Sequence, residues 1–82
     1  MPIITRFFGI VVKMYPNDHT PPHFHAIYGE YIGVIDIKTL EMLEGDLSNR
    51  AYKLVREWAE KYQNDLMDMW NTKLFRKLDG LE

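Results

Sequence analysis

The sequence predicts an α+β fold, in which an antiparallel sheet of three or four strands precedes two C-terminal helices packed on one of its faces. Three observations lead to this prediction. A run of β-branched and aromatic residues, Phe7 to Tyr15, is typical of a strand. Two alternating segments flank a Gly-Glu pair, as in a hairpin. An apolar repeat with helical spacing follows Ser48.

The first predicted strand, Phe7 to Tyr15, is largely apolar on both of its alternating faces, which indicates a central strand covered on both sides. Gly9 interrupts it, and we expect a helix or another backbone to approach closely there. Turn-forming residues and prolines from Pro16 to Pro22 predict a loop that leads into the next strand in an extended conformation.

Two alternating segments predict a hairpin that turns at Gly29-Glu30, with glycine first as a type II′ turn requires. A two-residue loop determines the register of the pair, and this register places His23 opposite Asp36. The hairpin strands are His23 to Tyr28 and Tyr31 to Lys38, and a short fourth strand, Leu40 to Glu44, is predicted to follow.

An apolar stripe with helical spacing predicts a helix that begins after the N-cap residue Ser48. Asn64 can cap a second helix, which we expect to end at Gly80. One continuous, bent helix is the alternative. The apolar stripe of a single helix would continue into the charged residues Lys73 and Arg76, so two helices are preferred.

The composition is that of a small globular protein. The 82 residues predict a single domain, residues 1–82, and 46% of them are hydrophobic. The absence of cysteine excludes a disulfide scaffold, a thiolate metal site and a cysteine nucleophile. The net charge of −2 disfavours a general nucleic-acid binder. No apolar run approaches the roughly 18 residues of a membrane span, so we expect a cytoplasmic protein.

The three histidines lie in one short stretch, Asn17 to Gly29, which suggests a metal site. Neighbouring side chains on one face of a strand lie about 6.5–7 Å apart, so His23 and His25 could both reach one zinc or another divalent metal. The competing interpretation is a set of surface or turn histidines with no cofactor. The predicted metal ligands are His19, His23 and His25, with Asp18 or Asp36 as a further ligand.

The predicted register also suggests a catalytic dyad of His23 and Asp36, in which the carboxylate orients the imidazole as a general base near neutral pH. His25 or Arg6 would assist, and the reaction would be RNA cleavage or another hydrolysis that needs no metal. The alternative is an ordinary cross-strand pair worth about 0.2–1 kcal/mol. These residues do not decide whether the protein is an enzyme.

Three tyrosines are expected near the same loop and hairpin end, namely Tyr15, Tyr28 and Tyr31. Together with Glu30 they would form a patch that binds a protein or stacks on RNA bases. The alternative places their rings in the small core, with the hydroxyl groups at its rim.

Several strings occur in order along the chain: ITRFFGIVVKMY, NDH-x-PPHFHA-x-YG, VIDI, an LEG turn and LVREWAE. With them the chain resembles a family of small, mostly bacterial proteins catalogued as domain of unknown function four-one-six-zero. The resemblance covers about residues 2–70. It implies a short α+β protein and maps the motif onto His19, His23, His25 and Glu30.

The same resemblance implies a gene often found beside another small uncharacterised family, two-four-four-two. That arrangement suggests a toxin–antitoxin-like two-gene module. The leading hypothesis is therefore a component that binds a small protein partner encoded nearby, and an exposed sheet edge makes a homodimer a further expectation. The alternatives are the hydrolytic enzyme and the histidine metal-binding module.

Overall fold

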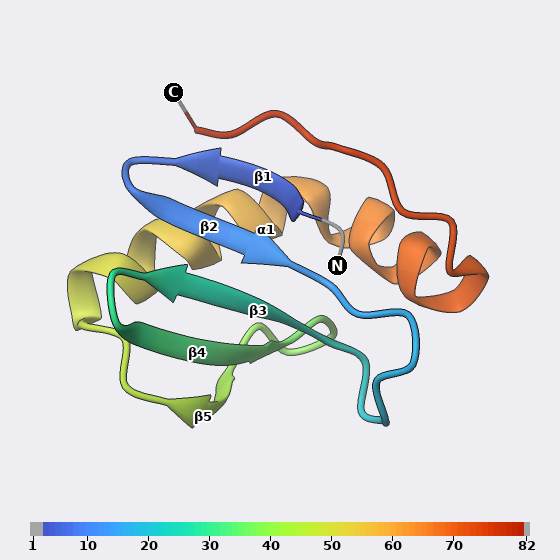
Figure 1. Ribbon diagram of the computed structural model, residues 1–82, viewed down its shortest axis with the longest axis horizontal. Coiled ribbons are helices and arrows are strands. Elements are labelled where there is room, and N and C mark those ends of the chain that lie inside the picture. Colours follow the sequence, from blue (N-terminus) through green and yellow to red (C-terminus); the bar gives the residue numbers. More distant parts are fainter. Residues whose placement is uncertain (1–2, 82) are drawn as a thin grey trace.

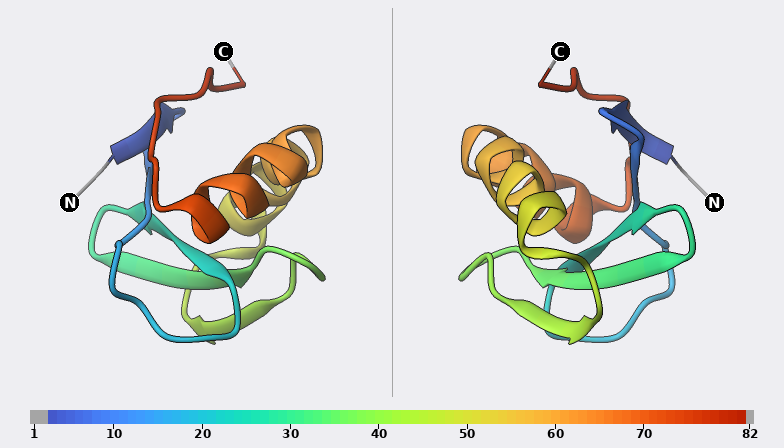
Figure 2. Two further views of the ribbon diagram at one scale, coloured as in Figure 1. Left: turned by 90° about the vertical axis from the view of Figure 1, so that its right-hand side faces the viewer. Right: turned by 90° about the vertical axis from the view of Figure 1, so that its left-hand side faces the viewer.

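The structure, a computed structural model, describes residues 3–81, which form a five-stranded antiparallel sheet and one α-helix (Figure 1). The strands lie in the sheet in chain order, and the helix covers one face (Figure 2). The α+β class is confirmed, whereas the predicted numbers of strands and helices were wrong. The elements are β1 (Ile3–Phe7), β2 (Ile10–Lys13), β3 (His23–Tyr28), β4 (Tyr31–Asp36), β5 (Met42–Gly45) and α1 (Asn49–Thr72).

The segment predicted as one strand, Phe7 to Tyr15, contains a hairpin turn that joins β1 to β2. Phe8 and Gly9 have φ values of 46° and 80°, and a two-residue turn of type I′ requires a positive φ at both positions. The turn escaped prediction because apolar strand residues flank it on both sides. The neighbour of Gly9 is a side chain rather than the expected helix or backbone, since a Cβ there would be 3.2 Å from the Tyr28 ring.

The predicted register of β3 and β4 is confirmed, with His23 opposite Asp36. The turn residue Gly29 has a φ of 61°, which glycine adopts without strain. The following strand begins later than predicted, because Leu40 belongs to a turn. Its N–H donates to the Asp36 carbonyl at 2.8 Å, and β5 starts at Met42.

The helix α1 begins as predicted, because the Ser48 hydroxyl accepts a hydrogen bond from the Ala51 N–H at 3.1 Å. It then continues to Thr72 with a bend at Tyr62, where φ is −114° and ψ is 19°. The bent-helix alternative is therefore correct and the two-helix prediction is wrong. In the described part of the chain, no helix combines the length and apolar character needed to cross a membrane. The buried residues of α1 are Ala51, Val55, Trp58, Ala59, Leu66, Met69 and Trp70.

Residues 73–81 form an extended tail beside β1 rather than the predicted second helix (Figure 1). Helix α1 ends where Lys73 adopts a left-handed conformation with φ 62°, and the chain then reverses. The Leu78 N–H donates to the Ile4 carbonyl at 2.8 Å. The indole N–H of Trp58 donates to the Asp79 carbonyl at 2.7 Å. The tail therefore covers the edge strand β1.

The core lies between the sheet and α1, and Trp58 is at its centre. Its ring stacks on Phe7 with centroids 5.8 Å apart and meets the edge of Phe24 at 5.9 Å. The hairpin residues Phe24, Ala26 and Ile35 are buried there. Tyr28 and Tyr31 are not, because they lie at the end of the sheet where the hairpins turn, and they are about half-exposed.

Candidate functional site

Strand β3 places His23 and His25 side by side, because alternate residues of a strand point to the same face. The pairing of β3 with β4 begins one residue earlier in the loop, where the Pro22 carbonyl accepts a hydrogen bond from the Ile37 N–H at 3.0 Å. The two histidine rings are 5.2 Å apart, centroid to centroid. The sequence prediction that they share a face is consistent with this contact.

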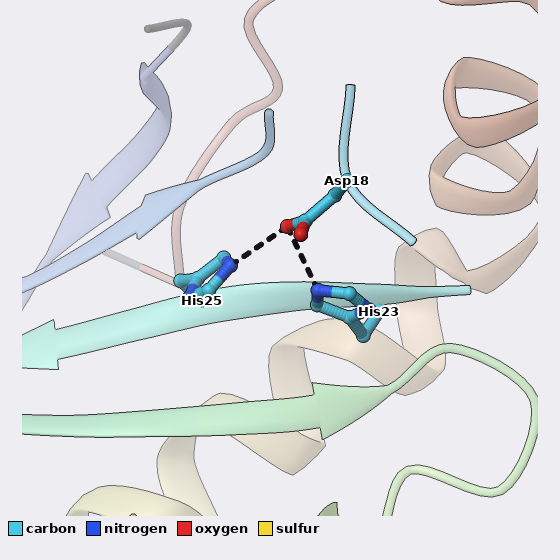
Figure 3. Close-up of side chains that lie close together, drawn as sticks. All are labelled: Asp18, His23 and His25. Atoms are coloured by element: carbon cyan, nitrogen blue, oxygen red, sulfur yellow. Dashed lines mark hydrogen bonds and ion pairs between the residues drawn. The ribbon is translucent and has the colours of Figure 1, made fainter. Parts of the chain in front are cut away.

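The loop between β2 and β3 brings Asp18 over both histidines (Figure 3). One oxygen of its carboxylate, Oδ2, lies 2.8 Å from His23 Nε2 and 3.1 Å from His25 Nε2. The three ligand-type atoms lie within 4.8 Å of one another. We call Asp18, His23 and His25 the Asp–His cluster, and the end of the sheet where it lies the loop end.

His23 is the buried member of this cluster, with 6% of its side chain exposed. Its second ring nitrogen, Nδ1, lies 2.7 Å from the Pro21 carbonyl oxygen. A carbonyl oxygen only accepts hydrogen bonds, so Nδ1 carries a proton and donates it. The Trp70 ring packs against His23 with centroids 5.2 Å apart, so both the orientation and the tautomer of this histidine are determined by its neighbours.

The surroundings of Asp18 act on its acidity in opposite directions. Partial burial raises the pKa of the carboxyl group, while hydrogen bonds from His25 and His23 and the attraction of their charges lower it. The histidine contributions outweigh burial, so the pKa of Asp18 lies below its ordinary value. Asp18 is accordingly a carboxylate at neutral pH and can act as an anionic ligand.

The predicted pairing of His23 with Asp36 does not form, although the two residues are opposite each other in the register. The Asp36 carboxylate instead accepts hydrogen bonds from the Lys38 and Thr39 N–H groups at 2.7 and 3.0 Å. It holds the turn after β4, and Asp18 takes the place beside His23. From the sequence, Asp18 was predicted only as a further metal ligand, because its distance from His23 depends on how the loop folds back.

The three predicted metal ligands do not all come together. His19 is 92% exposed, and its Nδ1 atom is 3.7 Å from the other carboxylate oxygen of Asp18. His23 and His25 converge on Asp18, while His19 points to solvent. The catalytic roles assigned to His23 and His25 stay predictions.

The predicted tyrosine patch is divided between the two ends of the sheet. Tyr15 packs edge-on against His25 at the loop end, with ring centroids 4.7 Å apart. Tyr28, Glu30 and Tyr31 lie at the opposite end, which we call the turn end. Phe8 lies there as well and was missed, because the sequence placed it inside a buried strand. The Phe-Gly pair was the available signal for a turn.

A family profile described as Domain of unknown function (DUF4160) matches residues 9–71. The chain belongs to this family. The match includes the whole Asp–His cluster and β2 to β5, and it extends almost to the end of α1. No curated protein and no solved structure matches the chain.

Proposed function

We propose that this DUF4160 protein acts by binding a small protein partner through the turn end of its sheet, as a component of a toxin–antitoxin-like two-gene module. The turn-end patch consists of Phe8, Tyr28 and Tyr31, each of which is between 45% and 54% exposed. Clustered exposed apolar and aromatic side chains are typical of protein-binding surfaces. This clustering at one end is the observation that supports the proposal.

The conformation of Phe8 gives a second argument. Its φ of 46° lies in the left-handed region, where an L-residue is less stable by roughly 1–2 kcal/mol. Asn or Gly is preferred in such a turn. Phe8 therefore combines backbone strain with a side chain that is 54% exposed. Strained residues concentrate at functional sites, and an exposed aromatic ring is well suited to binding a partner.

A pocket of about 290 Å³ lies beside the turn-end patch. Phe8 and Tyr28 line one side of it, and Arg50 and Leu54 from the first turns of α1 line another. An apolar side chain of a partner fits a lining of this kind, while the exposed Arg50 guanidinium can form an ion pair with a carboxylate at the rim. We infer that the partner presents an apolar anchor beside an acidic residue.

The test is co-purification with the product of the neighbouring gene after expression of both proteins in one cell. The wild type should form a stable complex with it. Tyr31→Ser and Phe8→Asn should each raise the Kd at least about 10-fold, because truncating an aromatic anchor typically removes 2 kcal/mol or more. Leu74→Ser is the matched control, since Leu74 is 74% exposed and lies in the tail, outside the turn-end patch. Its complex should be unchanged.

Two results would overturn the proposal. One is the absence of any complex between the two purified proteins. The other is a dimer of this chain alone that Tyr31→Ser dissociates, which would assign the turn-end patch to a second copy of the protein. Growth of cells that express each protein alone, and then both together, would show which of the two is harmful.

A further inference from the structure

The hydrogen bonds of His23 leave a lone pair on one of its nitrogens, and this lone pair faces another hydrogen-bond acceptor. Its Nδ1 proton is donated to the Pro21 carbonyl, so a neutral ring has a lone pair on Nε2. That lone pair points at Asp18 Oδ2, 2.8 Å away, and this oxygen belongs to a carboxylate that also only accepts. Two lone pairs at this distance repel each other unless a positive charge lies between them. The charge is either a proton or a metal ion.

The burial of His23, together with the position of His25, favours a metal ion over a proton. The Nε2 atom of His25 approaches the same Asp18 oxygen at 3.1 Å, so one carboxylate oxygen faces two ring nitrogens. A proton on His23 Nε2 would make that ring positive, because Nδ1 already carries a proton, and the side chain of His23 is only 6% exposed. A single divalent cation would neutralise the carboxylate and use both nitrogen lone pairs at once.

We propose that Asp18 Oδ2, His23 Nε2 and His25 Nε2 bind one divalent transition-metal ion, of which Zn²⁺ is the first to test. Two ligand atoms that are each 2.0–2.1 Å from zinc, at angles near 90–110°, lie roughly 2.8–3.4 Å apart. The distances of 2.8 and 3.1 Å from the Asp18 oxygen fall in this range. Imidazole and carboxylate ligands suit zinc and the neighbouring first-row metals.

The surroundings of His23 support a ligand role. Histidines that bind metals commonly donate the other ring N–H to a carbonyl or a carboxylate, which fixes the ring and increases its basicity. The hydrogen bond from Nδ1 to the Pro21 carbonyl provides this support. Packing against Trp70 further restricts the ring, so the Nε2 lone pair is aimed at the cluster before any ion arrives.

Three protein ligands leave room for a further one on the solvent side. The side chains of Asp18 and His25 are about one-fifth exposed, at 20% and 21%. Both also line a pocket of about 380 Å³ that extends to Leu43 and Glu44. Zinc sites with three protein ligands and an open position are typical of catalytic centres, whereas structural sites have four. The bound ion would therefore be accessible to a small ligand from this pocket.

The experiment measures thermal unfolding of the full chain, stripped with a chelator and then given ZnCl₂ alone. A cation that binds only the folded state raises the Tm, and zinc at 100 times its Kd should raise it by about 15 °C. Asp18→Asn and His25→Gln remove one ligand each from partly exposed positions, so both variants should stay folded. Neither should show more than a small fraction of the wild-type shift.

His19→Ala is the matched control, because it removes a neighbouring loop histidine that points to solvent. It should keep the wild-type zinc shift. A second readout uses Co²⁺ in place of zinc, since the visible absorption of bound cobalt reports the ligand geometry and is independent of stability. The bands should appear in the wild type and in His19→Ala, and they should be lost in Asp18→Asn.

Three outcomes would overturn the proposal. If zinc leaves the wild-type Tm unchanged, a proton holds the Asp–His cluster together. If Asp18→Asn and His25→Gln show the full shift, the ion binds elsewhere on the surface. If His19→Ala loses the shift as completely as Asp18→Asn, the assignment of three ligands is wrong. The partner-binding test at the turn end is independent of all three.

Discussion

The loop end and the turn end of the sheet contain opposite kinds of side chains. At the loop end, polar groups are enclosed and paired: His23 is buried against Trp70, and both of its nitrogens face an oxygen. At the turn end, large apolar side chains are exposed, and Phe8 occupies a strained turn position. Both arrangements depart from the usual preference for apolar residues inside and polar residues outside.

The difference follows from how the rest of the chain covers the sheet. Helix α1 begins near the turn end, where Arg50 and Leu54 line a pocket instead of filling it. Its last turns reach the loop end, where Trp70 contacts His23. The loop before β3 covers the same end from another side. The loop end therefore has the properties of a preorganised polar site, and the turn end has those of an unfilled apolar interface.

The largest expected effect is the loss of stability in His23→Ala. This change creates a cavity beside Trp70, leaves the Pro21 carbonyl without its partner and leaves the Asp18 carboxylate with His25 alone. The free energy of unfolding should fall by about 2–4 kcal/mol, as urea unfolding would measure it. His19→Ala should change it by less than about 0.5 kcal/mol, because that side chain is 92% exposed. Equal effects of the two changes would remove the distinction between enclosed and exposed histidines.

Asp18→Asn should have the next largest effect. An amide keeps the size of the side chain but loses the charge that attracts both histidines, so we expect a loss of about 1–2 kcal/mol without added metal. Urea unfolding of the chelator-treated protein measures this loss. A variant as stable as the wild type would show that the Asp–His cluster contributes nothing to folding.

Phe8→Asn should act in the opposite direction. Asparagine tolerates the left-handed conformation better than phenylalanine, so the variant should be more stable by about 0.5–1 kcal/mol. It should also bind the proposed partner more weakly, which would separate stability from function at this position. The measurements are the urea midpoint and the Kd of the complex. Lower stability would show that the Phe8 ring supports the fold.

The smallest expected effect on folding is that of Tyr31→Ser. Tyr31 is 50% exposed at the edge of a two-residue turn, and its replacement should change the free energy of unfolding by no more than about 0.5 kcal/mol. The urea midpoint of this variant should therefore match that of the Leu74→Ser control. A loss above 1 kcal/mol would indicate that the turn end is part of the core, and the comparison of the two ends would fail.

Local patterns in the sequence were sufficient for the features that depend on near neighbours. The Gly29-Glu30 turn determined the register of β3 and β4. The alternation of side chains along a strand placed His23 and His25 on one face. The Ser48 cap determined where α1 begins. The turn at Phe8-Gly9 was missed because it lacks the polar residues that usually mark a turn. Two short buried strands joined by an apolar turn have the same pattern as one long strand.

Contacts between distant segments account for the remaining features. The sequence offered both Asp36 and Asp18 as acidic residues near His23. The Asp36 carboxylate instead accepts hydrogen bonds from backbone N–H groups, and Asp18 reaches His23 because the loop folds back. Likewise, α1 continues through Tyr62 because both parts of its stripe pack on one sheet, and the tail extends because β1 offers it an edge. Side-chain spacing is a property of the chain, whereas these contacts depend on which surfaces remain uncovered once the sheet has formed.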